Sequence, residues 1–88
     1  MIEDLLREME EYASLHQVPI INARGRKVFR EILQKVRPHR ILEIGTAIGY
    51  SALLAISDGA ADAIVTTLEL DEERAALAAA YIVRSPYA

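Results

Sequence analysis

The sequence predicts an α/β fold in which two amphipathic helices precede a β-α-β-α unit with two parallel strands. Three observations predict this arrangement. Apolar residues recur at helical spacing through residues 2–36, and the period then changes at a short apolar run, 40–44. Two glycines follow that run at once and lead into a helical segment. A second run, 63–69, is rich in the β-branched residues that favour strands.

The first helix is predicted over residues 2–16, where apolar side chains alternate with charges, and Pro19 closes this segment. Its apolar positions are Ile2, Leu5, Leu6, Met9, Tyr12 and Ala13. The second helix ends before Pro38, because a residue that precedes proline is disfavoured in the helical region. Its apolar face contains Val28, Phe29, Ile32, Leu33 and Val36. Both helices therefore need a surface to pack on.

The second part of the chain has the pattern of a βαβ unit over residues 40–69. A helix over 51–56 is ended by Asp58-Gly59, and a last helix is expected over 72–83 with Asp71 as its N-cap. Strands joined through a helix run parallel with a right-handed crossover. We therefore expect one partial domain over residues 1–88, in which helices fill 1–38 and the βαβα unit fills 39–88.

The composition is that of a folded protein that lacks covalent crosslinks. Hydrophobic residues make up 52% and charged residues 26% of the 88 positions, and there is no cysteine, so neither a disulfide framework nor a thiolate metal site is predicted. The start is acidic, and the longest apolar stretch, 51–68, is interrupted by Asp58 and Asp62. We expect no secretory signal and no membrane span, and a cytoplasmic location.

Positive charge is concentrated in residues 24–40, which hold seven of the ten Lys and Arg residues: Arg24, Arg26, Lys27, Arg30, Lys35, Arg37 and Arg40. A solvated helix face is the simpler interpretation. A phosphate-bearing substrate such as a coenzyme A ester or a tRNA is a weaker alternative, since no aromatic residues are interleaved as in nucleic-acid sites. His16 and His39 are expected at the surface without a catalytic role.

The candidate site lies where the first strand ends, at the turn Glu43-x-Gly45-x-x-x-Gly49. Open α/β sheets bind ligands at the carboxyl ends of their strands. Glycines let the backbone approach a ligand closely, and free amides at the start of the next helix attract anions. Glu69 stands at the end of the second strand, where a carboxylate can accept both hydroxyl hydrogens of a ribose. The pattern predicts a nucleoside ligand.

The spacing separates two nucleoside classes. Turns that bind dinucleotides such as NAD read G-x-G-x-x-G, whereas this turn has a different glycine spacing and an acid, Glu43, within the strand. That acid disfavours a pyrophosphate beside it. The methionine part of S-adenosylmethionine carries an ammonium group for a carboxylate and a carboxylate for the amides. S-adenosylmethionine is therefore favoured, and NAD-type binding is the less favoured alternative.

Residues 40–51, read as Arg-Ile-Leu-Glu-Ile-Gly-Thr-Ala-Ile-Gly-Tyr-Ser, resemble the first motif of bacterial O-methyltransferases related to catechol and caffeoyl-CoA O-methyltransferases. Residues 18–20 and 65–74 resemble the same family in order and spacing. The resemblance implies the first part of a Rossmann-like methyltransferase domain and S-adenosylmethionine as cofactor. Ala47 stands where the commoner methyltransferase turn has a third glycine.

The resemblance also implies roles for individual residues. Seven residues would bind the cofactor: Glu43, Gly45, Thr46, Gly49, Tyr50, Ser51 and Glu69. Glu43, Tyr50 and Ser51 would surround the methionine part, and Glu69 would hold the ribose. The family activates the acceptor hydroxyl of a small molecule or nucleoside with a divalent metal or a base further along the chain, so no catalytic residue and no metal ligand is expected in residues 1–88.

The sequence stops after its second strand and the following helix, so we expect an N-terminal portion that does not catalyse methyl transfer alone. A structural or self-associating fragment without turnover is the alternative function. In the family fold the first strand pairs on both sides, which would leave one edge of residues 40–44 open here. We therefore expect a homo-oligomer formed through that edge.

Overall fold

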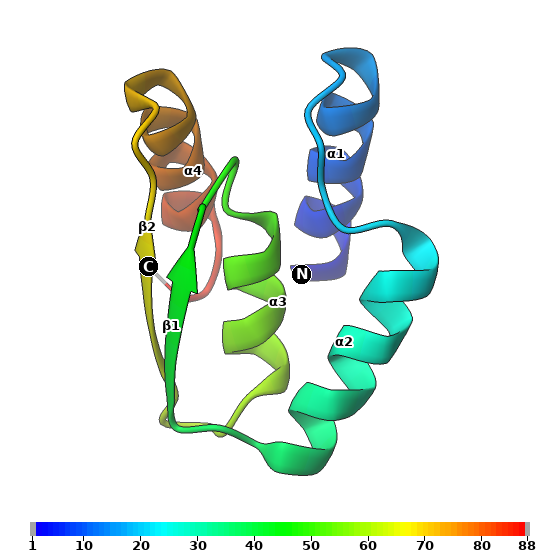
Figure 1. The fold of residues 1–88 in the computed structure, drawn as a ribbon, viewed down its shortest axis with the longest axis vertical. Coiled ribbons are helices and arrows are strands. Elements are labelled where there is room, and N and C mark those ends of the chain that lie inside the picture. Colours follow the sequence, from blue (N-terminus) through cyan, green and yellow to red (C-terminus); the bar gives the residue numbers. More distant parts are fainter. Residues whose placement is uncertain (1, 88) are drawn as a thin grey trace.

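The computed structural model describes residues 2–87, in the order α1 (Ile2–Leu15), α2 (Ala23–Val36), β1 (Arg40–Ile44), α3 (Tyr50–Asp58), β2 (Ile64–Leu68) and α4 (Glu72–Arg84). Figure 1 shows this order along the chain. The predicted α/β class and all six predicted elements are confirmed, and the bounds that were predicted agree with the structure to within two residues. Gly59 caps α3, and Asp71 caps α4 by accepting the N–H of Arg74 at 3.0 Å.

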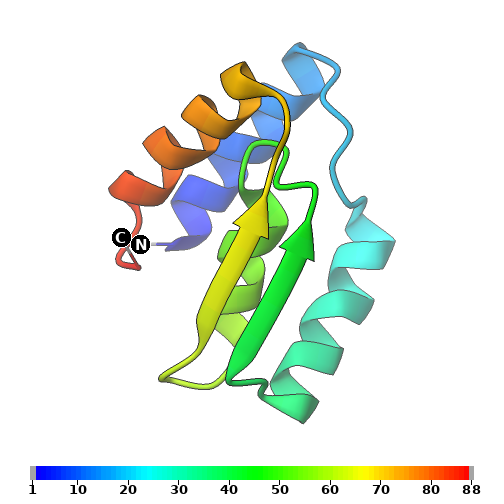
Figure 2. The ribbon, with the colours of Figure 1, turned by 60° about the vertical axis from the view of Figure 1, so that its left-hand side comes forward.

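The two strands pair in parallel, with Arg40 opposite Ile64 and Ile44 opposite Leu68. Within residues 2–87, β1 has no second strand neighbour, so the sheet is two-stranded and the outer edge of β1 is unpaired. Figure 2 shows both strands in the foreground with α3 behind them. The helices therefore cover one face of the sheet and leave the other face bare.

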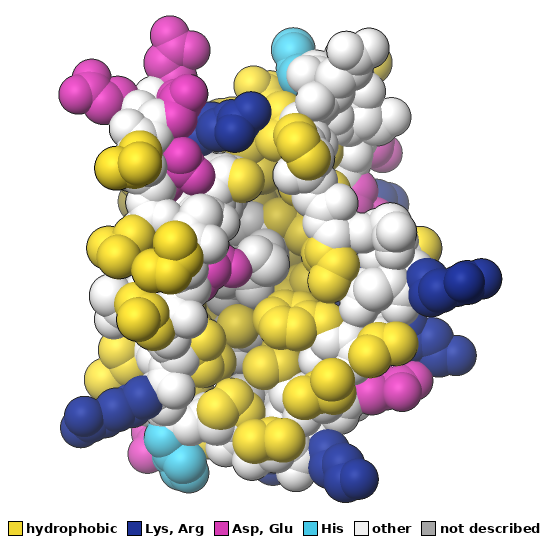
Figure 3. Space-filling view, in the orientation of Figure 1, with side chains coloured by type: hydrophobic (Ala, Val, Ile, Leu, Met, Phe, Trp, Pro, Cys, Tyr) yellow, Lys and Arg dark blue, Asp and Glu magenta, His cyan; other side chains and the backbone are white. Residues whose placement is uncertain are grey.

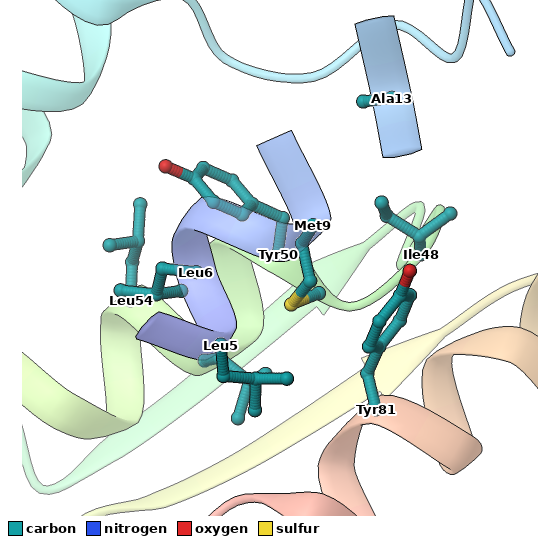
Figure 4. Packing of buried hydrophobic residues seen from close by; sticks show 9 residues of the cluster. Leu5, Leu6, Met9, Ala13, Ile48, Tyr50, Leu54 and Tyr81 are labelled. Carbon is teal, nitrogen blue, oxygen red and sulfur yellow. The ribbon is translucent and has the colours of Figure 1, made fainter. Parts of the chain in front are cut away.

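The core lies on the covered side of the sheet, where α1 and α4 meet α3. Leu5, Leu6 and Met9 of α1 pack with Tyr50 and Leu54 of α3, and Tyr81 comes from α4, as Figure 4 shows. The predicted apolar positions of α1 are thus the ones that contribute to the core. The second helix, α2, contributes less to the core, because Leu33 is the one residue of its predicted apolar face that is fully buried.

An ion-pair network joins the three helices that precede β2. Arg30 of α2 donates through Nε to Asp58 of α3 at 2.6 Å and through Nη2 to Glu3 of α1 at 3.1 Å. The Asp58 carboxylate is almost fully buried, so this contact lies partly in the protein interior. Arg30 therefore holds α2 against both α1 and α3.

In the part of the chain that the structure describes, no helix is long and apolar enough to cross a lipid bilayer.

Candidate cofactor-binding site

The turn between β1 and α3 is built on backbone conformations that suit glycine. Gly45 and Gly49 have φ of 89° and 90°. A side chain at Gly45 would meet nothing within 4 Å, so this glycine faces open space, whereas one at Gly49 would lie 3.3 Å from the Cβ of Ala78. Gly45 therefore leaves room beside the turn, and Gly49 lets α4 approach it.

Ala47 also has a positive φ, 50°, and is one of three non-glycine residues with this conformation among those described. The left-handed region costs an L-residue roughly 1–2 kcal/mol relative to glycine. A glycine at this position would adopt the same conformation without that cost. The N–H of Ala47 donates to Glu69, which ties this residue to the end of β2.

Glu43 lies at the centre of a hydrogen-bonded group of hydroxyls. Thr67 of β2 donates to Glu43 Oε1 at 2.8 Å, and the Ser51 hydroxyl donates to Oε2. Because the Thr67 hydrogen is directed to Glu43, Thr46 donates in turn to Thr67 Oγ1 at 2.6 Å. These bonds tie the turn, the start of α3 and β2 to one carboxylate, and leave Glu43 with unused acceptor capacity.

Glu69 holds the other side of the same turn. Its Oε1 accepts the N–H of Ala47 at 2.7 Å, and its Oε2 accepts the N–H of Asp71 at 3.0 Å. These two N–H groups hold the pKa of Glu69 below its usual value, the bond from Asp71 contributing most. The carboxylate is thus ionised at neutral pH, and each oxygen keeps a lone pair for a further donor.

The start of α3 supplies free N–H groups between these carboxylates. Its N-cap is Gly49, whose lack of a side chain leaves the first turn without a side-chain cap. The first amides of a helix have no intrahelical partner and carry partial positive charge. A negatively charged group beside residues 50–52 would therefore be stabilised.

A pocket of about 220 Å³ opens beside the turn. The loop between α1 and α2 forms one wall, and the turn and the start of α3 form the other. Its lining residues are Pro19, Ile20, Ile21, Gly45, Thr46, Ala47, Tyr50 and Ser51. Four of the seven predicted site residues, Gly45, Thr46, Tyr50 and Ser51, line this pocket.

Tyr50 is the predicted site residue whose environment differs most from the expectation. Its ring is almost fully buried in the core, and its hydroxyl donates to Glu10 of α1. Burial, followed by the Glu10 carboxylate, raises the pKa of Tyr50 well above its usual value. Arg26 of α2 lies over the ring at 5.7 Å from its centroid and 3.6 Å from Glu10. Tyr50 thus borders the pocket while anchoring the turn to both N-terminal helices.

The sequence analysis missed several contributions to this site. Thr67 joins Glu43 to Thr46, and its signal was its position two residues before Glu69, on the same face of β2 as that acid. Glu10 and Arg26 carried no local signal, since their partner is far away in the sequence. The loop residues Ile20 and Ile21 had no signal of their own apart from the family resemblance at residues 18–20.

The basic block is partly neutralised by the fold. Arg26 pairs with Glu10, and Arg30 pairs with Asp58 and Glu3. His39 is exposed and pairs with Asp62 at 2.7 Å, at the end of the sheet opposite the turn. Among residues 2–87, no three acidic or histidine side chains are close enough together to hold a metal ion.

Comparison with known proteins places the chain in a family. Its sequence matches the O-methyltransferase family over residues 1–88, and the protein therefore belongs to that family. A protein from Staphylococcus aureus, described as a caffeoyl-CoA O-methyltransferase, is 30% identical and superposes with a TM-score of 0.83. The match covers 90% of this chain and 37% of that one.

Two further structures contain ligands. An O-methyltransferase from Bacillus cereus in complex with SAH is 27% identical, with a TM-score of 0.79 over 96% of this chain and 39% of that one. TomG from Streptomyces achromogenes, an O-methyltransferase of tomaymycin synthesis in complex with SAM, is 24% identical, with a TM-score of 0.76 over 91% and 37%. The latter likeness concerns the fold alone. This chain spans less than two-fifths of the length of these proteins.

Proposed function

We propose that this chain forms the S-adenosylmethionine-binding part of an O-methyltransferase. One observation carries the proposal: two carboxylates, Glu43 and Glu69, are fixed on either side of the uncapped start of α3. A ligand with one cationic group, one anionic group and a ribose finds a partner for each of them there. The SAH in the Bacillus cereus relative supports this choice of ligand.

The proposed roles follow from the geometry of the turn. Glu43 accepts a hydrogen bond from the ammonium group of the methionine part of the ligand. The first amides of α3 bind the carboxylate of that same methionine part. Glu69 uses its remaining lone pairs for the two ribose hydroxyls. Gly45 leaves room for the ligand, Thr46 and Ser51 fix the Glu43 side, and Gly49 and Tyr50 keep the turn against α4 and α1.

When bound, S-adenosylmethionine supplies a sulfonium methyl group, which in this family is transferred to an oxygen nucleophile. The residues described here bind and orient the cofactor, and we assign none of them to catalysis. The acceptor is proposed to be a hydroxyl of a small molecule or nucleoside. A divalent metal, if the full enzyme uses one, would be held by residues outside this chain.

A structural fragment without turnover remains the second candidate function. The observation that favours it is the bare face of the sheet, which leaves the fold less covered than a complete α/β domain. A dinucleotide such as NAD is less well supported, because the Glu43 carboxylate would lie close to its pyrophosphate. Binding measurements distinguish these candidates.

The first test is calorimetric titration of the chain with S-adenosylmethionine, S-adenosylhomocysteine and NAD. We expect saturable binding of the first two and none of NAD. Glu69→Gln keeps the side-chain shape but removes the charge, and it should weaken binding by about tenfold or more, since hydrogen bonds to charged groups are the stronger ones. Glu73→Gln, an exposed acid in the first turn of α4, is the matched control and should bind like the wild type.

The outcomes are distinct. Binding of S-adenosylmethionine that Glu69→Gln weakens supports the cofactor site. Equal weakening by Glu73→Gln would show that the loss comes from the changed net charge and not from a contact at Glu69. A folded chain that binds neither S-adenosylmethionine nor S-adenosylhomocysteine contradicts the proposal and supports the structural fragment as the function.

A further inference from the structure

The loop between α1 and α2, residues 16–22, forms one wall of the pocket beside the turn. Figure 3 shows the surface hollowed between this loop and the strands, with hydrophobic side chains along the hollow. Pro19, Ile20 and Ile21 make the wall, and the two isoleucines are half-buried against the core. The width of the pocket therefore depends on what holds α1 and α2 against α3.

Three side chains connect the helices on either side of this loop to the first residue of α3. The Tyr50 hydroxyl donates to Glu10 of α1, and Nη1 of Arg26 in α2 lies 3.6 Å from the same carboxylate. Arg26 also lies over the Tyr50 ring, 5.7 Å from its centroid. The Glu10 and Arg26 side chains are 35% and 23% exposed, so water and salt screen their attraction only in part. We call these three residues the Tyr50 cluster.

A close packing contact links the position of α2 to the pocket wall. Gly25 precedes Arg26, and a Cβ at Gly25 would lie 3.0 Å from Cγ1 of Ile21. The Gly25 N–H also donates to the side chain of Asn22, the N-cap of α2, at 2.8 Å. Because packed interiors transmit displacements, a shift of α2 would move Ile21 with it. The contacts of Arg26 with Glu10 therefore fix the wall as well as the helix.

We propose that Tyr50, Glu10 and Arg26 are positioning residues, which keep the Ile20–Ile21 wall at a fixed distance from the turn and so keep the pocket ready for its ligand. Tyr50 suits this role because it is the first residue of α3, where the free amides lie. S-adenosylmethionine as the ligand rests on the proposed function, whereas the placement of the wall does not. Neither Glu10 nor Arg26 needs to touch the ligand.

Amide hydrogen exchange followed by NMR tests the placement of the wall without a ligand. The Val18 N–H donates to the Ala13 carbonyl at 2.9 Å, so the Val18 and Gly25 amides report on the two ends of the loop. Tyr50→Phe keeps the ring and removes the hydroxyl. We expect both amides to exchange at least about fivefold faster in this variant, because a hydrogen bond to a charged group is lost. The Arg74 amide, bonded to the N-cap of α4, should keep its rate.

Tyr81→Phe is the matched control, since Tyr81 is another buried tyrosine of the core. It should leave the Val18 and Gly25 amides at their wild-type rates. Unchanged loop amides in Tyr50→Phe overturn the inference. Equal acceleration of the loop amides and the Arg74 amide would show a general loss of stability, and would overturn it as well.

Two changes at Glu10 test whether the cluster acts as a unit. Glu10→Gln keeps an acceptor for the Tyr50 hydroxyl but loses the charge that faces Arg26, and Glu10→Ala removes both. We expect the loop amides to exchange faster in Glu10→Ala than in Glu10→Gln. Adding Tyr50→Phe to Glu10→Ala should cause no further acceleration, because both changes remove the same hydrogen bond. A further acceleration in the double variant contradicts the unit.

Titration with S-adenosylhomocysteine separates the positioning role from the proposed function. Tyr50→Phe should raise the dissociation constant about fivefold, because the ligand must then order the loop, and Tyr81→Phe should leave it unchanged. If the wild type does not bind, the proposed function fails and the loop amides alone decide whether the cluster positions the wall. If the wild type and Tyr50→Phe bind equally well, the proposed function stands and the positioning role is overturned.

Discussion

Glu69 accepts two backbone N–H groups, and its negative charge therefore stabilises the turn even without a ligand. Its folded-state pKa is lowered from an ordinary value near 4.5, so its contribution to the free energy of unfolding is present above that value and is lost as the pH falls through the lowered pKa. We expect Glu69→Gln to be less stable than the wild type at neutral pH and equally stable once Glu69 is protonated.

Urea unfolding at a series of pH values from neutral to acid measures this difference. Glu73→Gln is the control, since Glu73 is an acidic residue in the first turn of α4, at the positive end of the helix dipole. A stability difference between wild type and Glu69→Gln that is the same at all pH values would contradict the explanation by charge.

Gly49 combines a left-handed backbone with close packing against α4. Gly49→Ala should lower the free energy of unfolding by about 1–2 kcal/mol through the backbone alone. The added Cβ would also lie 3.3 Å from that of Ala78, which increases the loss. Gly45→Ala has nearly the same φ but an open neighbourhood, and should cost less. Urea unfolding of both variants compares them, and equal losses would show that packing against Ala78 is unimportant.

Sequence reasoning identified the residues at the turn but not how they are held. The glycines and the two acids have local signals, namely spacing and position at strand ends. The Thr46–Thr67–Glu43 hydrogen bonds and the Tyr50–Glu10 contact join elements that are distant in sequence. Hydrophobic periodicity carries no information about such pairs, because it reports only which side of an element faces the core.

The helices and strands were predictable because local signals agreed with one another. Pro38, Gly59 and Asp71 mark boundaries by backbone chemistry that does not depend on the rest of the fold. The second helix is the exception in its packing. Its predicted apolar face, Val28 to Val36, is largely exposed in the structure, and polar contacts of Arg26 and Arg30 join α2 to α1 and α3.

The Arg30–Asp58 pair should therefore contribute measurably to the docking of α2. Asp58→Asn keeps the shape but removes the charge that Arg30 faces, and we expect a loss of about 2 kcal/mol in the free energy of unfolding, because the carboxylate is nearly buried. Urea unfolding measures the loss, and a double-mutant cycle with Arg30→Met isolates the pair.

Arg7→Ala supplies the comparison at the surface. Arg7 pairs with Asp4 at 3.3 Å, and both side chains are mostly exposed. Exposed pairs contribute little, so this change should cost less than about 0.5 kcal/mol. Equal losses for Asp58→Asn and Arg7→Ala would show that burial of Asp58 adds nothing to the pair.

The molecule as a whole is small and open on one side, so ligand binding should have a large effect on its stability. A chain of this size has a marginal core. At a ligand concentration about 100 times its dissociation constant, binding adds roughly 2.7 kcal/mol, which for a small domain raises the Tm by roughly 10–20 °C. We expect this shift with S-adenosylhomocysteine and not with NAD, measured by differential scanning calorimetry.

Every group proposed to touch the cofactor lies between Pro19 and Glu69. Within this segment the two parallel strands are connected by the single helix α3. During translation these groups have all been synthesised once β2 has left the ribosome. A nascent chain that bound the nucleoside at that stage would be stabilised while both strands were newly exposed, the moment at which exposed strands are most prone to aggregate. The order of elements in this chain thus allows the cofactor to act as a folding aid during synthesis.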